Sequence, residues 1–211
     1  EYHRLARQHA ETSLRHLLRP DGASYHTFFF DQETGAPVGP RTHQGCADDS
    51  LWARGQAWAI YGFALAAEWC EEPSFLKAAQ RAAQRFMSEL PADSVPTWDL
   101  RLPGDAPRYR DSSAGAIAAC GMLRLARLQD SQGGADFRTW ACALLNALVV
   151  HCFETEPGAQ GLLRHGTYHA HKGLGVDAYF ICGDYFLLEA LLAVQGKTVD
   201  FWGPGGSLWI P

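Results

Sequence analysis

Apolar residues recur along most of the chain at steps of three and four, the spacing that puts side chains on one face of an α-helix. Residues 74–90 show this clearly, with Phe75, Ala79, Phe86 and Leu90 on one predicted face. The same pattern predicts helices over residues 2–18, 50–70, 74–90, 111–128, 135–153 and 184–194. The chain is therefore expected to be all-α.

Long connections with Gly and Pro alternate with short ones. The long stretches are residues 20–45, 91–110 and 157–183, and the short turns fall near 71–73 and 131–134. Long loops in a compact domain are usually functional. The alternation predicts stacked helical hairpins whose long loops gather at one end.

One long loop also predicts a small β element. Residues 24–30 are rich in aromatic side chains and are expected to form a short strand or hairpin with the segment near Thr42.

Composition narrows the class of protein. The chain is 47% hydrophobic and 19% charged, which is typical of a globular fold. The net charge is −5 and no run of Lys and Arg occurs, which argues against nucleic acid as a partner. No stretch approaches 18 apolar residues, so no membrane span is expected.

The two ends of the chain suggest its extent. The first residues read as the inside of a helix and no initiator Met precedes them, which indicates a fragment or a trimmed chain. The Gly- and Pro-bearing tail, residues 203–211, is predicted to be a flexible end beyond a structured unit, residues 1–202.

The six Cys residues form no CxxC pair. Cys70, Cys120, Cys142 and Cys152 lie in apolar helical segments and are expected to be buried free thiols. Free thiols suit a reducing compartment and favour a cytoplasmic location. Disulfides stay open as an alternative because the number of Cys is even.

Candidate functional side chains are most frequent at residues 42–58, THQGCADDSLWARGQAW, where a loop meets a helix. The Arg54 guanidinium is a planar fork of donors that matches a carboxylate. Trp58, four residues on and on the same helix face, offers a flat apolar ring on which a sugar can stack. His43 and Gln44 can bond hydroxyls or position a water. An acidic sugar requires this combination.

Structural explanations compete with this one. The block is also consistent with an ordinary helix start in which Arg54 pairs with Asp48 or Asp49. His26 is equally consistent with a structural histidine whose hydrogen bonds are satisfied. Asp111 is expected to be the N-cap of the fourth helix, with its carboxylate accepting from first-turn N–H groups.

Other chemistries lack their motifs. His165, His169 and His171 are of a residue type that binds zinc. However, neither HExxH nor a Cys/His ligand spacing is present, so no metal is predicted. GxSxG, the P-loop and GxGxxG after a strand are absent too, and no cofactor is expected.

Six pieces of the chain, taken in order, resemble one known family. They are DGASYHTFFFD, THQGCADDSLWARGQAWAIYGF, VPTWD, RDSSAGAIAACGMLRLA, HGTYH and GVDAYFICGDYFLLEAL. They resemble glycoside hydrolase family 88, the unsaturated glucuronyl hydrolases, from about residue 4 to 202. The resemblance implies an (α/α)6 barrel of twelve helices, of which the six predicted here are the C-terminal half.

The resemblance also implies a site and a reaction. The substrate-binding residues that it carries over are His26, His43, Gln44, Arg54, Trp58 and Tyr168. In the family an Asp protonates the C4=C5 double bond of a terminal unsaturated uronic acid and activates water for addition at C5, after which the sugar opens and leaves its neighbour. That Asp belongs to the N-terminal half, so no catalytic residue is assigned in this chain, and the expected partner is an unsaturated uronic-acid oligosaccharide.

Two alternatives stay open. The chain is also consistent with a catalytically incomplete sugar-binding remnant, or with an unsaturated rhamnogalacturonyl hydrolase. The latter enzymes typically carry Asn where this chain has Gln56, which favours family 88. Some family members bind sulfate through Ser-x-x-Ser-x-Lys, but His169, Lys172 and Leu174 stand at those positions here, so the pattern is broken.

Overall fold

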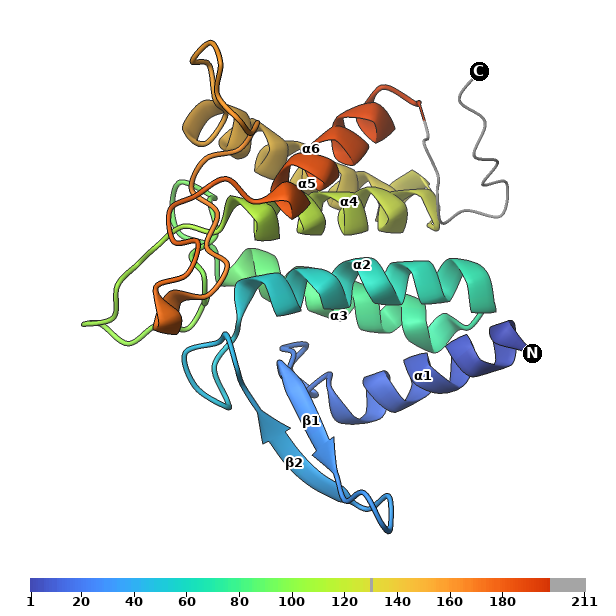
Figure 1. Ribbon diagram of the computed structural model, residues 1–211. Coiled ribbons are helices and arrows are strands. Elements are labelled where there is room, and N and C mark those ends of the chain that lie inside the picture. The colour runs from blue at the N-terminus through green and yellow to red at the C-terminus, as the bar shows by residue number, and fades with distance from the viewer. Residues whose placement is uncertain (130, 198–211) are drawn as a thin grey trace.

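The chain folds into helices and one small sheet in a computed structural model that describes residues 1–129 and 131–197 (Figure 1). The helices of this part are α1 Tyr2–His16, α2 Ala53–Cys70, α3 Pro73–Ser88, α4 Ser112–Arg127, α5 Ser131–His151 and α6 Ile181–Val194, with a 3-10 turn at Ala170–Lys172. The all-α prediction is confirmed, and each predicted helix end lies within four residues of the observed one.

The start of α2 shows why the periodicity of apolar residues does not predict helix ends accurately. The prediction began at Ser50, whereas the helix begins at Ala53. Leu51 and Ala53 instead pair with the chain before α4, through Leu100 N to Leu51 O at 2.8 Å and Ala53 N to Trp98 O at 3.1 Å. A tertiary hydrogen bond therefore replaces the first helical turn.

The predicted hairpin is present. β1 Thr27–Phe30 pairs antiparallel with β2 Pro37–Arg41, with Thr27 opposite Arg41 and Phe29 opposite Gly39. The hairpin projects away from the helices and returns the chain to the start of α2 (Figure 1).

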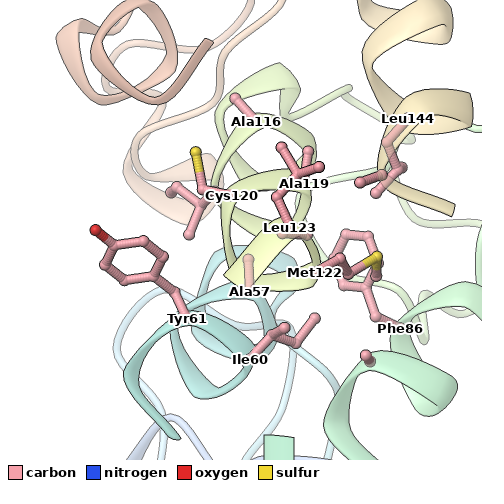
Figure 2. Close-up of a cluster of buried hydrophobic side chains, with 14 of the residues drawn as sticks. Ala57, Ile60, Tyr61, Phe86, Ala116, Ala119, Cys120, Met122, Leu123 and Leu144 are labelled. Carbon is pink, nitrogen blue, oxygen red and sulfur yellow. The ribbon is translucent and has the colours of Figure 1, made fainter. Parts of the chain in front are cut away.

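Helix α4 is the centre of the core. Fourteen of its sixteen residues are buried, because α2, α5 and α6 all pack against it. In Figure 2, Ala119 and Met122 of α4 lie between Ile60 of α2 and Leu144 of α5. Small side chains allow close approach, and at Gly121 a Cβ would lie 2.8 Å from the backbone nitrogen of Tyr61. The Ala-rich sequence thus produces tightly packed helices.

The outer faces of the first and last helices carry exposed apolar side chains. None of the residues of α1 is buried, and Tyr2 and Leu5 are 87% and 46% exposed. On α6, Ile181 and Leu188 are 75% and 50% exposed. Apolar side chains are therefore exposed on both the first and the last helix of the described chain.

The three long loops gather at one end of the helices, as the alternation of connections predicts (Figure 1). They lie where α2 and α4 begin, so residues far apart in sequence meet there. Residues 198–202 and the tail 203–211 lie outside the described residues, and the extent of the structured unit stays a prediction.

The six Cys residues are all free thiols, and Cys70, Cys120 and Cys152 are buried as predicted. The prediction is wrong for Cys142, which is exposed. Leu144 and Leu148 of α5 are fully buried, and the helical turn places Cys142 on the other side of this amphipathic helix. Among the described residues, no helix is both long and apolar enough to span a bilayer.

Candidate functional site

A buried carboxylate organises the loop before α2. Asp99 is fully buried, and its carboxylate accepts from Cys46 N at 2.9 Å, Ser50 Oγ at 2.6 Å and Leu51 N at 3.1 Å. Hydrogen bonds of this kind compensate the loss of hydration that burying a charge entails. The loop that carries His43 and Gln44 is therefore tied to the core by one side chain.

The sequence reasoning did not single out Asp99. The signal was an acidic residue between Trp98 and Leu100 in an apolar stretch. A carboxylate there is either exposed or bound by several donors, and a single sequence does not tell which.

His26 lies beneath the same loop. Its Nδ1 faces Thr42 Oγ1 at 3.0 Å and accepts from the backbone N–H groups of His43 at 3.1 Å and Gln44 at 3.3 Å. An accepting Nδ1 carries no proton, so the neutral ring holds its proton on Nε2. Burial, followed by the nearby His43 and Arg54 charges, lowers the pKa of His26 to about 4. The hydrogen bonds of His26 are therefore satisfied, as in the structural alternative given by the sequence. His26 also lines a cavity.

That cavity lies between α1 and the start of α2 and has a volume of about 330 Å³. His26 and Trp58 line it, together with Trp52, Tyr25 and residues of α1. Trp58 packs edge-to-face on Phe186 of α6, with ring centroids 5.3 Å apart. Aromatic faces and an imidazole in one hollow suit the mixed apolar and polar surface of a sugar ring.

Arg54 is buried, with 3% of its surface exposed. Its Nη1 lies 2.5 Å from Asp111 Oδ2. The structural alternative, in which Arg54 pairs with Asp48 or Asp49, does not hold, because Asp111, the N-cap residue of α4, lies beside the first turn of α2. Asp48 pairs instead with Arg41 at 3.8 Å.

Asp111 occupies the N-cap position, as predicted, but its carboxylate makes no capping bond to the helix backbone. It accepts from Arg54 and from Ser113 Oγ at 2.5 Å. Burial raises the pKa of the Asp111 carboxyl, and the adjacent Arg54 opposes that rise. The Asp111 carboxylate, which a local cap would use as its acceptor, is instead engaged in an ion pair between α2 and the start of α4.

The loop before α2 and the loop before α6 are joined at Tyr168. Its carbonyl accepts from Gln44 Nε2 at 2.6 Å and from Arg54 Nη2 at 2.8 Å. His171 Nε2 lies 2.8 Å from the carbonyl of Gly45. The phenol ring of Tyr168 stays about half exposed. Residues more than 120 positions apart are thereby brought into one site.

Basic side chains gather around this junction. Burial, then the charges of Lys172, His171, His43 and Arg54, lower the pKa of His169. His169 is itself buried, and its Nδ1 has no hydrogen-bond partner among the residues that the structure describes. Basic side chains in this position suit an anionic ligand. Within residues 1–129 and 131–197, no group of three or more His, Cys, Asp and Glu side chains is placed to hold a metal ion.

The six predicted site residues therefore lie at one end of the molecule, although they differ in exposure. His26 and Trp58 line the cavity, His43 and the ring of Tyr168 are exposed, and Gln44 bridges the two loops. Arg54 lies behind them.

Comparison with known proteins relates this geometry to a class. No family model matches the chain. It is 43% identical over 205 residues to an unsaturated glucuronyl hydrolase of Bacillus sp. (strain GL1), and 41% identical over 206 residues to an unsaturated chondroitin disaccharide hydrolase of Streptococcus pyogenes serotype M1. These alignments cover 96% and 95% of this chain but 54% and 51% of the relatives, so the chain spans about half of their length.

The fold agrees with the sequence. The crystal structure of the unsaturated glucuronyl hydrolase from Bacillus sp. GL1 superposes with a TM-score of 0.93 at 42% identity, over 98% of this chain and 55% of that one. The fold that the chain shares is that of the helical-barrel glucuronyl hydrolases. Over its own length, which is about half of theirs, the chain is similar to unsaturated glucuronyl hydrolases in both sequence and fold.

Proposed function

We propose that this chain supplies the substrate-binding surface of an enzyme that removes a terminal unsaturated uronic acid from an oligosaccharide by hydrating its C4=C5 double bond. The observation that carries the proposal is an aromatic-lined hollow bounded by His26 and Trp58. The ring of His26 accepts from the backbone of the same loop whose Gln44 side chain donates to the carbonyl of Tyr168. The relatives with this fold are named for unsaturated glucuronyl and chondroitin disaccharides.

Each predicted residue has a role in this proposal. Trp58 stacks against the sugar ring, and the exposed His43 and Tyr168 donate hydrogen bonds to its hydroxyls. His26, neutral with its proton on Nε2, offers one donor toward the cavity. Gln44 donates a hydrogen bond to the carbonyl of Tyr168 and, in this proposal, lies beside the sugar ring. Arg54 is too buried to contact much of the sugar. It acts chiefly by holding the carbonyl of Tyr168 in place.

The charge of the site supports an acidic sugar over a neutral one. Burial, followed by the charges of Lys172, His171, His43 and Arg54, lowers the pKa of His169. A uronate carboxylate placed beside His43, His169 and Lys172 opposes the part of this shift that comes from the neighbouring charges. The proposed substrate provides one such carboxylate, and no metal ion is part of the proposal, since water addition to a vinyl ether can proceed by general acid–base catalysis alone.

The proposal is tested by titrating the chain with an unsaturated glucuronyl disaccharide, followed by calorimetry, while ultraviolet absorbance reports the double bond. The saturated disaccharide and an unsaturated rhamnogalacturonyl disaccharide serve as comparison ligands. Selective binding of the first ligand is expected. Loss of absorbance indicates a complete enzyme, and binding without loss indicates a binding half or a remnant. Tighter binding of the rhamnogalacturonyl ligand favours the sister activity, and failure to bind either unsaturated ligand contradicts the proposal.

A further inference from the structure

We propose that Asp111 is a positioning residue, which holds Arg54 so that residues 167–168 and Gln44 keep their places in the site. This inference rests on the proposed function. It assigns to Asp111 a role other than helix capping, and it places Arg54 behind the site as the connecting element.

The guanidinium of Arg54 is restrained on every side that the structure describes. Its charge is met by Asp111, which is fully buried and is itself oriented by Ser113. Its Cζ also lies over the rings of Trp52 and Phe180, 4.8 and 5.1 Å from their centroids. A planar cation that meets a carboxylate, two aromatic rings and two backbone carbonyls is restricted in its orientation.

That orientation fixes two carbonyls of the loop before α6. Arg54 Nη1 donates to Thr167 O at 2.9 Å, and Nη2 donates to Tyr168 O at 2.8 Å. Gln44 Nε2 donates to the same Tyr168 oxygen at 2.6 Å. One acceptor therefore joins the two loops, and a displacement of that carbonyl moves both Tyr168 and Gln44.

The negative charge at position 111 is what this arrangement requires. An asparagine there has the same shape, but it leaves a buried guanidinium without its counter-charge. The cation is then expected to draw water or to turn toward solvent, and its bonds to the two carbonyls are lost. A lysine at position 54 keeps the charge but lacks the planar fork that reaches several acceptors at once.

A second, partly buried ion pair joins the same two helices and supplies a control. Arg124 of α4 lies 2.9 Å from Glu68 of α2, and their side chains are 6% and 19% exposed. Arg124 also lies 3.6 Å from Glu189 of α6, so the Glu68→Gln variant retains one carboxylate beside it. This pair lies near the C-terminal ends of α2 and α4, whereas Arg54 and Asp111 lie at the N-terminal ends, about 20 Å away along the helices. Glu68→Gln thus removes a similar pair between α2 and α4 without touching the site.

The test compares Asp111→Asn, Arg54→Lys and Glu68→Gln in the full chain, well below their melting temperatures. Hydrogen exchange of the amides of residues 165–169 and calorimetric binding of the unsaturated glucuronyl disaccharide are measured on each. In both site variants we expect faster exchange confined to these amides and the loop before α2, with a dissociation constant raised about tenfold or more. Glu68→Gln is expected to leave both readouts close to wild type while lowering the melting temperature.

The outcomes separate the two proposals. Unchanged exchange at residues 165–169 in a folded Asp111→Asn or Arg54→Lys variant overturns the positioning role, and so does an unchanged dissociation constant. Equal effects from Glu68→Gln overturn it as well, because general loosening of α2 against α4 then explains the result. If the wild-type chain binds no disaccharide, the proposed function fails, and the exchange data still decide whether Asp111 holds the loop. If Asp111→Asn does not fold, Arg54→Lys decides it.

Discussion

Single residues in this site have charge states that follow from their neighbours. His26 accepts two backbone N–H groups on Nδ1, and burial together with nearby basic groups lowers its pKa to about 4. The side chain is therefore neutral in the folded protein at every pH above about 5, whereas in the unfolded chain it protonates near pH 6.5.

The first prediction concerns acid stability. Because the pKa of His26 is lower in the folded state, the unfolded state binds more protons between about pH 6.5 and 4, and the free energy of unfolding falls as pH falls through that window. Urea unfolding between pH 7.5 and 4 measures the fall. In His26→Gln, which retains a hydrogen-bonding side chain but no titration, the slope is expected to be shallower. An identical slope in both proteins would rule out His26 as the source.

The second prediction concerns Trp58. It lines the cavity and packs on Phe186, so Trp58→Ala removes both a ligand contact and core packing. We expect disaccharide affinity about tenfold lower and a free energy of unfolding lower by about 1–3 kcal/mol. Trp58→Phe, which keeps an aromatic ring, should recover most of the stability.

Trp69, an exposed residue at the other end of the same helix, provides the control. Trp69→Ala is expected to leave affinity unchanged. Wild-type affinity in a folded Trp58→Ala variant would show that the ring does not meet the sugar.

At the scale of elements, the close approach of α2 and α4 sets the geometry of the loop end. Both helices begin at the site, and their contact depends on a residue without a side chain. A Cβ on Gly121 would lie 2.7 Å from Cγ2 of Ile60 and 2.8 Å from the nitrogen of Tyr61. A backbone atom cannot move aside as a flexible side chain can.

The third prediction follows from that contact. Gly121→Ala should lower the free energy of unfolding by about 1–3 kcal/mol, because α2 and α4 must separate to admit the methyl group. Gly62→Ala is the matched change within α2, where a Cβ meets nothing within 4 Å. It should raise stability by up to about 1 kcal/mol through helix propensity. Thermal unfolding of the two variants checks the opposite signs, and equal shifts would contradict the steric argument.

At the scale of the whole molecule, the relevant feature is the apolar surface that α1 and α6 expose to water. Ile181, Tyr185 and Leu188 stand on α6 at spacings of four and three, which places them on one face, and each is at least 36% exposed. Tyr2 and Leu5 expose apolar surface at the opposite side of the helix array. Contiguous apolar surface of this kind promotes association in water.

The fourth prediction is that this chain by itself associates as its concentration rises. Leu188→Lys, which places a charge within the α6 face, should shift the equilibrium toward monomer. Val38→Lys, in the hairpin and 63% exposed, alters an apolar residue away from that face and should have little effect. Sedimentation velocity over a hundredfold concentration range measures this. A chain that stays monomeric at the highest concentration would contradict the prediction.

The sequence by itself determined the helices, the hairpin and the resemblance to unsaturated glucuronyl hydrolases. Amphipathic periodicity is a local property that each helix expresses without its neighbours, so the helix predicted at residues 74–90 was placed to within two residues at each end. Chain order also placed His43 and Gln44 at the end of a long loop, and Arg54 in the helix that follows it.

Only the tertiary structure decided what those side chains contact. Asp111 could cap its helix or pair with an arginine, and the choice depends on the packing of α2 on α4, which brings Arg54 within 2.5 Å. Tyr168 lies 124 positions from Gln44, and no local pattern reports that the amide of one bonds the carbonyl of the other. Long-range contacts depend on how helices pack, and a buried charge takes the partner that packing places beside it.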